Sequence, residues 1–296
     1  MQTILNQLFV GLSIASILLL VALGLTFTFG QMNVINMAHG EFIMAGAYTT
    51  YVLQTALGTG AVTLAFGLAL PAAFLVAGTL GLILELTVIR RLYGRPLDTL
   101  LVTWGVGLML QQLARDLFGA QNVNVSAPGF LDGGVGVLGV SLSHSRLFII
   151  AVVVLVVVAI ALYMQRTAAG RRMRAVMQNR PLAAVSGVRT KLVDRTTFFI
   201  GSGLAGLAGV GITLLGPVGP TLGLAYIIDA FLVVIVGGLG QLRGAIFAAL
   251  ALGMANSFIE YGTSASIAKA GVFLLIVLFL QWRPQGMVVQ ARRGLA

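Results

Sequence analysis

The chain has 296 residues, of which 58% are hydrophobic and only 9% charged, and its mean hydropathy is +1.02. Because a soluble domain keeps about 25% of its residues charged, this composition excludes a water-soluble protein and predicts an all-α, polytopic membrane bundle. The lack of cysteine excludes a disulfide framework and thiol chemistry, and two histidines are too few for a histidine-rich metal centre.

The charge is concentrated in a few places. The net charge is +10, and most of the 18 basic residues lie in three short segments, 90–95, 166–195 and 283–293. These segments flank apolar spans rather than exposed aromatic residues, so the charge indicates the cytoplasmic side of a membrane and no nucleic-acid partner. The pattern predicts a multi-pass protein of the bacterial inner membrane with a cytoplasmic C-terminus.

Apolar runs of spanning length, roughly 20 residues, follow one another along the chain. The first lacks the basic start and the cleavage site of a secretory signal, so we expect it to remain as a span. Spans are expected at about 4–29, 40–57, 61–89, 99–118, 147–165, 196–216 and 267–282. The glycine-rich sequence of 201–211 favours close helix contact, which predicts a central position for that helix.

The stretch 226–260 differs from the other spans. Its first part, 226–239, is too short to cross comfortably, and a glycine-rich turn at 237–244 precedes a second apolar run. Transporters use such pieces where the backbone lines a cavity, so an interrupted or re-entrant pair is one interpretation; a tight turn between two thin spans is the other. The total is eight or nine crossings, with 120–145 and 217–225 facing outward.

The basic segment 166–195 has an internal helical pattern. Apolar residues within 173–177 form a stripe at helical spacing, Pro181 suits the first turn of a second short helix, and Gly187 is placed to end it. Two short amphipathic helices in the cytosol predict a docking surface for a partner protein. The alternative is a basic loop lying on anionic lipid head groups.

The chain carries no recognisable energy source. Neither lysine, Lys191 or Lys269, lies in a G-x-x-x-x-G-K-[ST] phosphate-binding loop. Ion-coupled carriers usually contain intramembrane acids, and here acids near spans are few: Glu41, Glu85, Asp229 and Glu260. A transport protein that borrows a separate ATPase is therefore favoured, with no cofactor and no catalytic residue of its own.

Polar residues inside apolar segments are the candidates for a transport pathway. They are Asn33, Asn36, His39, Glu41, Trp104, Gln111 and Asp229. A buried amide in lipid is costly unless it is hydrogen-bonded, so such groups either line a wet pathway or satisfy one another. The structural alternatives are a capped helix start at 33–41, helix–helix hydrogen bonds for Trp104 and Gln111, and a helix N-terminal position for Asp229.

Two other classes of protein are disfavoured. An intramembrane enzyme that used His39 and Glu41 as acid and base would need a positioned partner, and no Ser–His pair or metal-ligand set accompanies them. A gated channel would not need the pair of cytoplasmic helices.

Long blocks of the chain resemble a known family. Residues 33–51, Asn-Val-Ile-Asn-Met-Ala-His-Gly-Glu and onward, closely resemble the signature of the branched-chain amino-acid ABC permeases, and the block 187–209 does so too. The resemblance covers essentially the whole chain. Further blocks resemble the urea-permease branch of that family: 96–105, 174–180, 216–220 and 281–286.

The resemblance implies a single transmembrane permease domain, 1–296, within a five-part importer. A sister permease, two ATPase subunits and a periplasmic binding protein would be its partners, with membrane lipid around it. Urea is the expected cargo, and a branched-chain amino acid or a short amide is the alternative. The resemblance places the coupling contact with the ATPase in the loop 166–195, at Arg171, Arg174, Met177, Gln178, Asn179, Ala183, Ala184 and Gly187.

Overall fold

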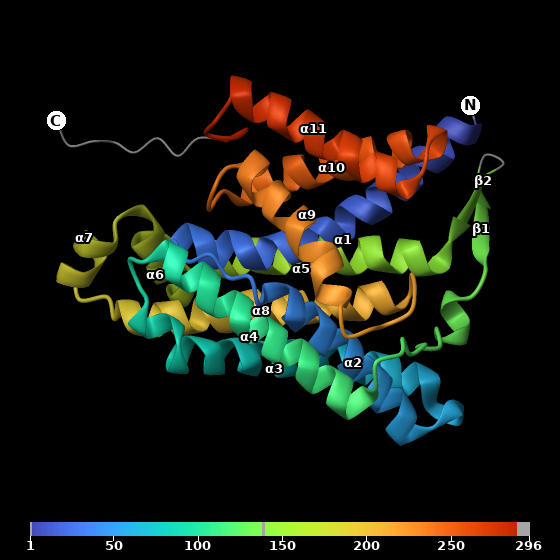
Figure 1. Ribbon diagram of the computed structural model, residues 1–296, viewed down its shortest axis with the longest axis horizontal. Helices are drawn as coiled ribbons and strands as arrows, with labels where there is room; N and C mark the ends of the chain where they lie inside the picture. Colours follow the sequence, from blue (N-terminus) through green and yellow to red (C-terminus); the bar gives the residue numbers. More distant parts are fainter. Residues whose placement is uncertain (1, 138–139, 289–296) are drawn as a thin grey trace.

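Helices account for most of the computed structural model, which describes residues 2–137 and 140–288 (Figure 1). The helices are α1 (Gln2–Met32), α2 (His39–Leu57), α3 (Val62–Thr87), α4 (Pro96–Phe118), α5 (His144–Arg166), α6 (Ala168–Gln178), α7 (Arg180–Val185), α8 (Thr190–Thr213), α9 (Leu222–Gly237), α10 (Leu242–Gly262) and α11 (Ala265–Trp282). Short 3-10 turns lie at Thr59–Ala61, Ile89–Arg91 and Gly129–Leu131. The prediction of an all-α bundle is confirmed.

One small antiparallel hairpin, β1 (Gly134–Val137) with β2 (Val140–Ser143), departs from the all-helical pattern. It lies at the end of the bundle where the chain begins, opposite the end that carries α6 and α7 (Figure 1). Residues 138–139 of the expected outward loop lie outside the described residues, and so do residues 289–293 of the last basic segment.

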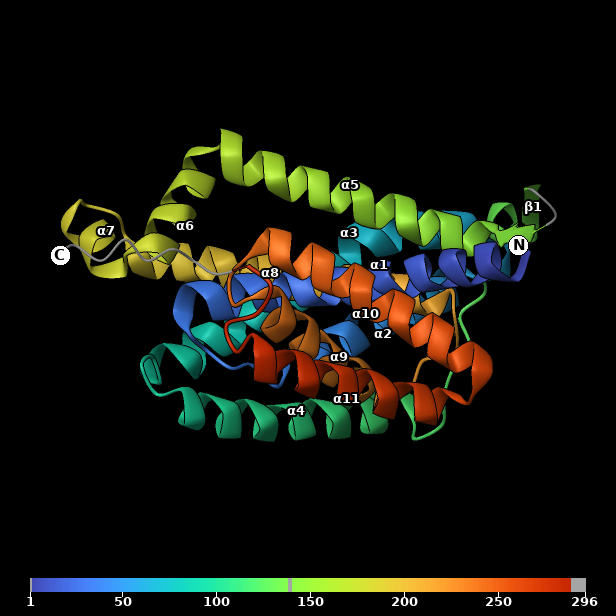
Figure 2. The ribbon, with the colours of Figure 1, turned by 90° about the horizontal axis from the view of Figure 1, so that it is seen from above.

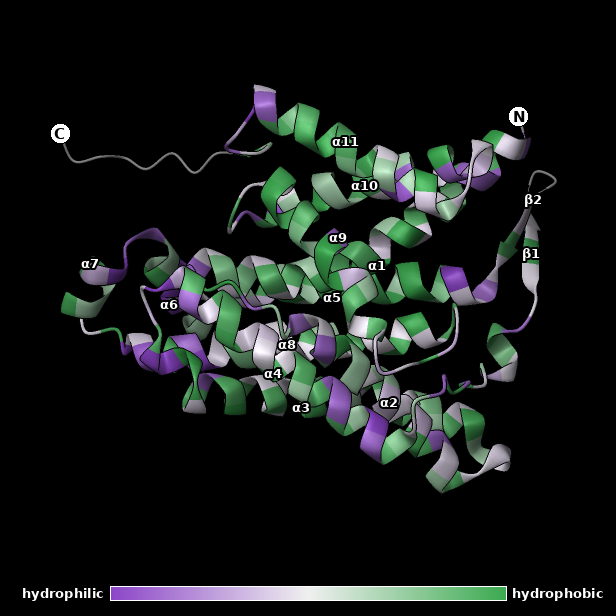
Figure 3. Ribbon diagram, in the orientation of Figure 1, coloured by the Kyte–Doolittle hydropathy of each residue, from purple (hydrophilic) through white to green (hydrophobic). Residues whose placement is uncertain are grey.

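Six described helical segments are long and apolar enough to cross a membrane. They comprise α1, α3 with its flanking turns, α5, α8, α10 and α11. Figure 3 shows apolar residues covering most of α5, α10 and α11, with hydrophilic residues gathered at the α6–α7 end. Side chains such as Val154, Leu155 and Leu274 are exposed, as expected of faces turned to lipid or to another subunit.

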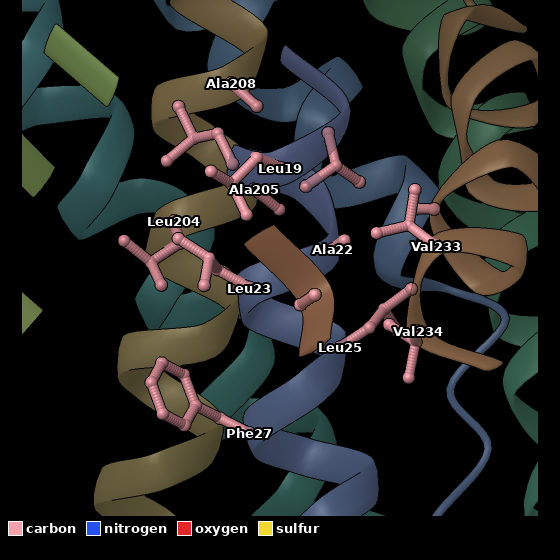
Figure 4. Close-up of a cluster of buried hydrophobic side chains, with 14 of the residues drawn as sticks. Leu19, Ala22, Leu23, Leu25, Phe27, Leu204, Ala205, Ala208, Val233 and Val234 are labelled. Atoms are coloured by element: carbon pink, nitrogen blue, oxygen red, sulfur yellow. The ribbon is translucent and has the colours of Figure 1, made fainter. Parts of the chain in front are cut away.

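The centre of the bundle is the crossing of α1 and α8, as the glycine-rich sequence predicts. A Cβ built on Gly201 would lie 2.9 Å from the carbonyl oxygen of Gly24, so the two backbones touch there and only glycine fits. Around this crossing, apolar side chains of α1, α8 and α9 interlock, including Leu23, Leu204 and Val233 (Figure 4).

Two spans are interrupted. The segment 33–38 has no helix, and α2 begins only at His39, inside the bundle; similarly, α9 begins at Leu222 after the irregular stretch 214–221 and has only 16 residues (Figure 1). The first turns of α2 and α9 meet, because a Cβ on Gly40 would lie 2.6 Å from the oxygen of Gly223.

The outcome for 226–260 is therefore mixed. The short helix α9 lies there as expected, but α10 is of spanning length, and residues 238–241 form a tight turn in which Gly238 and Gly240 have positive φ. The irregular backbone that interrupts the span lies before α9 and not after it. A similar irregular segment precedes α2, although hydropathy predicted an ordinary span there. The apolar content of a helix such as α2 does not reveal that the backbone before it, here 33–38, is irregular.

The helix order repeats with inverted direction. Helices α1 to α4 and α8 to α11 correspond in order, and α2 and α9 are each the shortest helix of their own set of four. Helix α8 packs on α3 as α1 packs on α10, and α1 and α8 run in opposite directions (Figures 1 and 2). Membrane transporters commonly use such inverted repeats, with discontinuous helices near the middle of the membrane.

Candidate functional site

A projection at one end of the bundle is formed by α6 and α7 (Figures 1 and 2). The Thr167 hydroxyl accepts a hydrogen bond from the Gly170 N–H at 2.9 Å and caps α6, and Asn179 Oδ1 accepts from the Leu182 N–H at 3.0 Å and caps α7. After α7 the chain turns at Gly187, with φ +84°. The predicted pair of short helices, with its proline start and glycine stop, is confirmed.

The coupling candidates do not all lie on the surface of this projection. Exposed are Arg171, Arg174, Gln178, Asn179, Ala184 and Gly187. Ala183 is buried, and Met177 is half-buried against α1, where a Cβ on Gly30 would lie 3.4 Å from its Cε. The exposed apolar side chains are instead Leu182 and Val185, at 59% and 82%, which the expected contact set did not include.

A buried charge pair holds the base of α7. Arg180 donates two hydrogen bonds to the carboxylate of Asp194 on α8, at 3.0 and 2.5 Å. Asp194 is fully buried, and Gln31 at the end of α1 donates to it at 2.9 Å. The side-chain amide oxygen of Gln31 in turn accepts a hydrogen bond from the Thr197 hydroxyl at 2.7 Å. The start of α7 is thereby tied to the ends of α1 and α8.

A second layer of the same network reaches α3. The Arg180 guanidinium lies 5.4 Å from the centre of the Tyr93 ring, and the Tyr93 hydroxyl donates to Glu85 at 2.8 Å. Burial, together with the nearby negative charge of Asp194, raises the pKa of Tyr93, so its hydroxyl stays protonated and continues to donate. The hydrogen bonds that Arg180 donates to Asp194 raise the pKa of Arg180, which keeps the pair charged.

None of the residues predicted to line a pathway belongs to this network. Asp194 is the lone acid in a basic segment and Glu85 an acid within an apolar span, and both were visible signals. The linear sequence could not show that Arg180 pairs with Asp194, or that Tyr93 connects Arg180 to Glu85.

A second polar group lies in the centre of the membrane region, around the start of α2. Glu41 accepts a hydrogen bond from the Gln111 amide at 2.8 Å, and His39 Nε2 lies 3.1 Å from the carbonyl oxygen of Val21. Asn36, His39 and Glu41 are all buried. Gln111 thus forms a hydrogen bond between α4 and α2, which is the structural alternative given for it above. The other alternative, a capped start of α2, is not found, because no side chain caps that helix at Ala38.

This central group is incompletely satisfied. Within the described residues, both amide atoms of Asn36, Nδ1 of His39 and Oε2 of Glu41 are buried without a hydrogen-bond partner. Such groups in a membrane region require water or a moving partner. Two other pathway candidates lie apart from them: Asn33 is exposed with φ +53°, and Trp104 faces outward on α4 with 52% of its surface exposed.

The last candidate, Asp229, lies in a different place, on the second turn of α9. It faces Lys269 of α11, with 3.8 Å between Oδ2 and Nζ, beside a cavity of about 240 Å³. The described residues contain no group of three His, Cys, Asp or Glu side chains placed to hold a metal ion. The sequence-predicted residues thus fall into separate regions: the projection, the central group and this cavity.

Comparison with known proteins places the chain in a family. The family described as "Branched-chain amino acid transport system / permease component" matches residues 7–281. BraD, a high-affinity branched-chain amino acid transport system permease protein of Pseudomonas aeruginosa, is 30% identical over 96% of this chain and 95% of its own. LivH, the permease protein so named in Escherichia coli K12, is 28% identical with the same coverage.

A more distant relative, the probable branched-chain amino acid transport permease protein LivH of Methanocaldococcus jannaschii, is 28% identical over 83% of this chain and 78% of its own. No solved structure matches the chain. The family match begins within α1 and ends within the last turn of α11, and it includes both the projection and the interrupted spans. The chain therefore belongs to the family of permease components of branched-chain amino acid transport systems, which are transport subunits rather than enzymes.

Proposed function

We propose that this chain is one membrane-spanning permease of an ATP-binding-cassette importer whose cargo is a branched-chain amino acid. The family match over residues 7–281 and the names of the relatives carry this proposal. Urea, the cargo expected from four short blocks of sequence, has no support among these relatives. The alternative given with it, a branched-chain amino acid, is the better supported cargo.

The proposed importer contains a sister permease, two ATPase subunits and a periplasmic binding protein. The basic charge supports an orientation with α6 and α7 in the cytoplasm, because the described parts of all three basic segments gather at that end of the bundle (Figure 1). The C-terminus then lies in the cytoplasm and the hairpin end faces the binding protein, in the bacterial inner membrane. Lipid and the sister subunit cover the exposed apolar faces.

The loop 166–195 is the proposed coupling element. Exposed apolar residues of α7, Leu182 and Val185, suit insertion into a cleft of an ATPase, and the preceding helix α6 exposes basic residues such as Arg174. Because Arg180 and Asp194 tie α7 to the ends of α1 and α8, a displacement of α7 would be passed to both central helices. The stiffness of this connection supports coupling better than lipid binding by a loose loop.

Uptake into vesicles tests the proposal. With both permeases, the ATPases and the binding protein reconstituted, we expect ATP-dependent accumulation of labelled leucine that isoleucine and valine reduce and excess urea does not. Accumulation of urea without competition by leucine would show that the cargo is wrong. Uphill accumulation by this chain alone, without ATPase subunits, would disprove the whole proposal.

A further inference from the structure

A cavity of about 240 Å³ lies between α1, α9, α10 and α11. Its wall is largely aliphatic, formed by Ile14, Ile17, Leu18, Leu232, Leu252 and Val272. The cavity lies beside the middle of α1. It also lies beside the parts of α10 and α11 that are nearer the hairpin end of the bundle. It therefore lies on the side of the bundle that cargo from a binding protein would reach first.

One pair of opposite charges interrupts this apolar wall. Asp229 Oδ2 and Lys269 Nζ are 3.8 Å apart, too far for a hydrogen bond, and their side chains are 32% and 58% exposed. Tyr226 and Asn256 also line the cavity, and neither side chain forms a hydrogen bond within the described part of the chain. Charged residues in membrane segments are costly and mark functional sites.

The charges and the apolar wall complement one class of molecule. We propose that this cavity receives the cargo as a zwitterion, with Asp229 binding the ammonium group, Lys269 the carboxylate, and the aliphatic wall the branched side chain. The inference rests on the proposed function and deepens it, since it names the groups that meet an amino-acid cargo. Urea would leave both charges without an ionic partner and the aliphatic wall without contact.

The position of the cavity in the repeat supports this assignment. Transporters with inverted repeats bind substrate near the middle of the membrane, beside a discontinuous helix and between the two repeats. Here α9 is one of the two discontinuous helices, and α1 belongs to the first repeat whereas α9, α10 and α11 belong to the second. A loosely held ion pair at such a place can open to admit the cargo's two charged groups without the loss of any hydrogen bond.

The competing explanation is that Asp229 and Lys269 merely join α9 to α11. Asp229→Asn and Lys269→Met, made singly and together, distinguish the two. If the pair is only structural, each single change leaves one uncompensated charge, and the double change should restore function. If the pair binds cargo, the double variant should assemble at least as well as either single variant and bind the cargo worst.

The measurement is binding of labelled leucine to the purified permease–ATPase complex in lipid nanodiscs, without binding protein. We expect each single variant to weaken binding by about tenfold, the equivalent of one lost charged contact, and the double variant by more. Glu260→Gln, which neutralises an exposed acid of α10 outside the cavity, is the matched control and should bind as the wild type does. Unchanged binding in Asp229→Asn, recovery in the double variant, or no binding by the wild type would each overturn the inference.

A size test is independent of the charges. Ala225 is exposed and lines the cavity, so Ala225→Phe should occupy space there without displacing the core. We expect leucine binding by the same complex to fall roughly tenfold relative to alanine binding, and an unchanged ratio would refute the assignment. If the wild-type importer takes up leucine and these variants do so equally well, only the site is wrong; if the wild type takes up no leucine, the proposed function fails.

Discussion

The ion pair at the base of α7 permits a quantitative prediction. Arg180→Met removes the guanidinium and leaves the fully buried Asp194 carboxylate with Gln31 as its donor among the described residues. Removal of one partner from a buried pair costs about 3–5 kcal/mol. Because 36% of the Arg180 side chain is exposed and water can approach, we expect the lower end, about 3 kcal/mol of unfolding free energy.

Removal of the other partner of the pair should cost less unfolding free energy. Asp194→Asn keeps an oxygen that can accept from Gln31, and it leaves a guanidinium that can turn toward water, so we expect a loss of about 1–2 kcal/mol. The double variant no longer buries a lone carboxylate. It should therefore be more stable than Arg180→Met alone by roughly 1–2 kcal/mol. Because Asp194→Asn costs about 1–2 kcal/mol in the wild type, the expected coupling energy of the pair is about 2–4 kcal/mol.

Unfolding by SDS in mixed micelles, followed by circular dichroism, measures these differences. Arg174→Met is the matched control, since Arg174 is exposed on α6, and it should change the stability by no more than about 0.5 kcal/mol. Stability of Arg180→Met equal to that of this control, or additive losses in the double variant, would refute the structural role of the pair. In the assembled importer, Arg180→Met should hydrolyse ATP with reduced uptake.

Four further predictions concern other parts of the molecule. Gly40→Ala should destabilise the bundle by about 1–3 kcal/mol, because the new methyl group would lie 2.6 Å from a backbone oxygen. Gly67→Ala, which meets open space on α3, should not, and equal effects in the same unfolding assay would contradict the close contact. Gln111→Leu leaves a buried carboxylate without its donor and should cost about 1–3 kcal/mol, so unchanged stability would argue against that hydrogen bond. Because the pKa of Tyr93 is raised on folding, the unfolded chain loses this proton first, and stability should fall as the pH rises above about 10. That fall should be smaller in Tyr93→Phe, measured by unfolding at a series of pH values, and an identical pH profile would exclude the effect. Val185→Asp, at a site 82% exposed, should leave folding intact but reduce ATP-driven uptake, and normal uptake would disprove docking at this residue.

Features that depend on composition and near neighbours could be read from the sequence. Scarce charge predicted the membrane bundle because lipid solvates apolar side chains whatever their order. The projection was equally predictable, since helix caps, Pro181 and Gly187 act on the backbone within a few residues of themselves. The glycine-rich face of α8 likewise marked a central helix, because small side chains let helices approach closely.

The break before α2 shows where the sequence was not sufficient. Residues 33–38 contain neither proline nor glycine, and the local signal that ends α1 is Asn33, which adopts the left-handed conformation with φ +53°. The rest of the segment is held from outside, because the Thr103 hydroxyl on α4 accepts a hydrogen bond from the Met37 N–H at 2.9 Å. Its conformation therefore depends on a helix about 65 residues away along the chain.

Composition and short-range spacing alone determined that this is a helical membrane protein with a projecting pair of short helices, because solvent preference and helix capping are local effects. Only the tertiary structure decided which polar groups meet. It separated Trp104 from the central group and paired Asp229 with Lys269. It also joined Arg180 to Asp194 and Gln31 at the foot of α7. Such pairs depend on how helices distant in the sequence cross, and the crossing is set by the shapes of many packed side chains together.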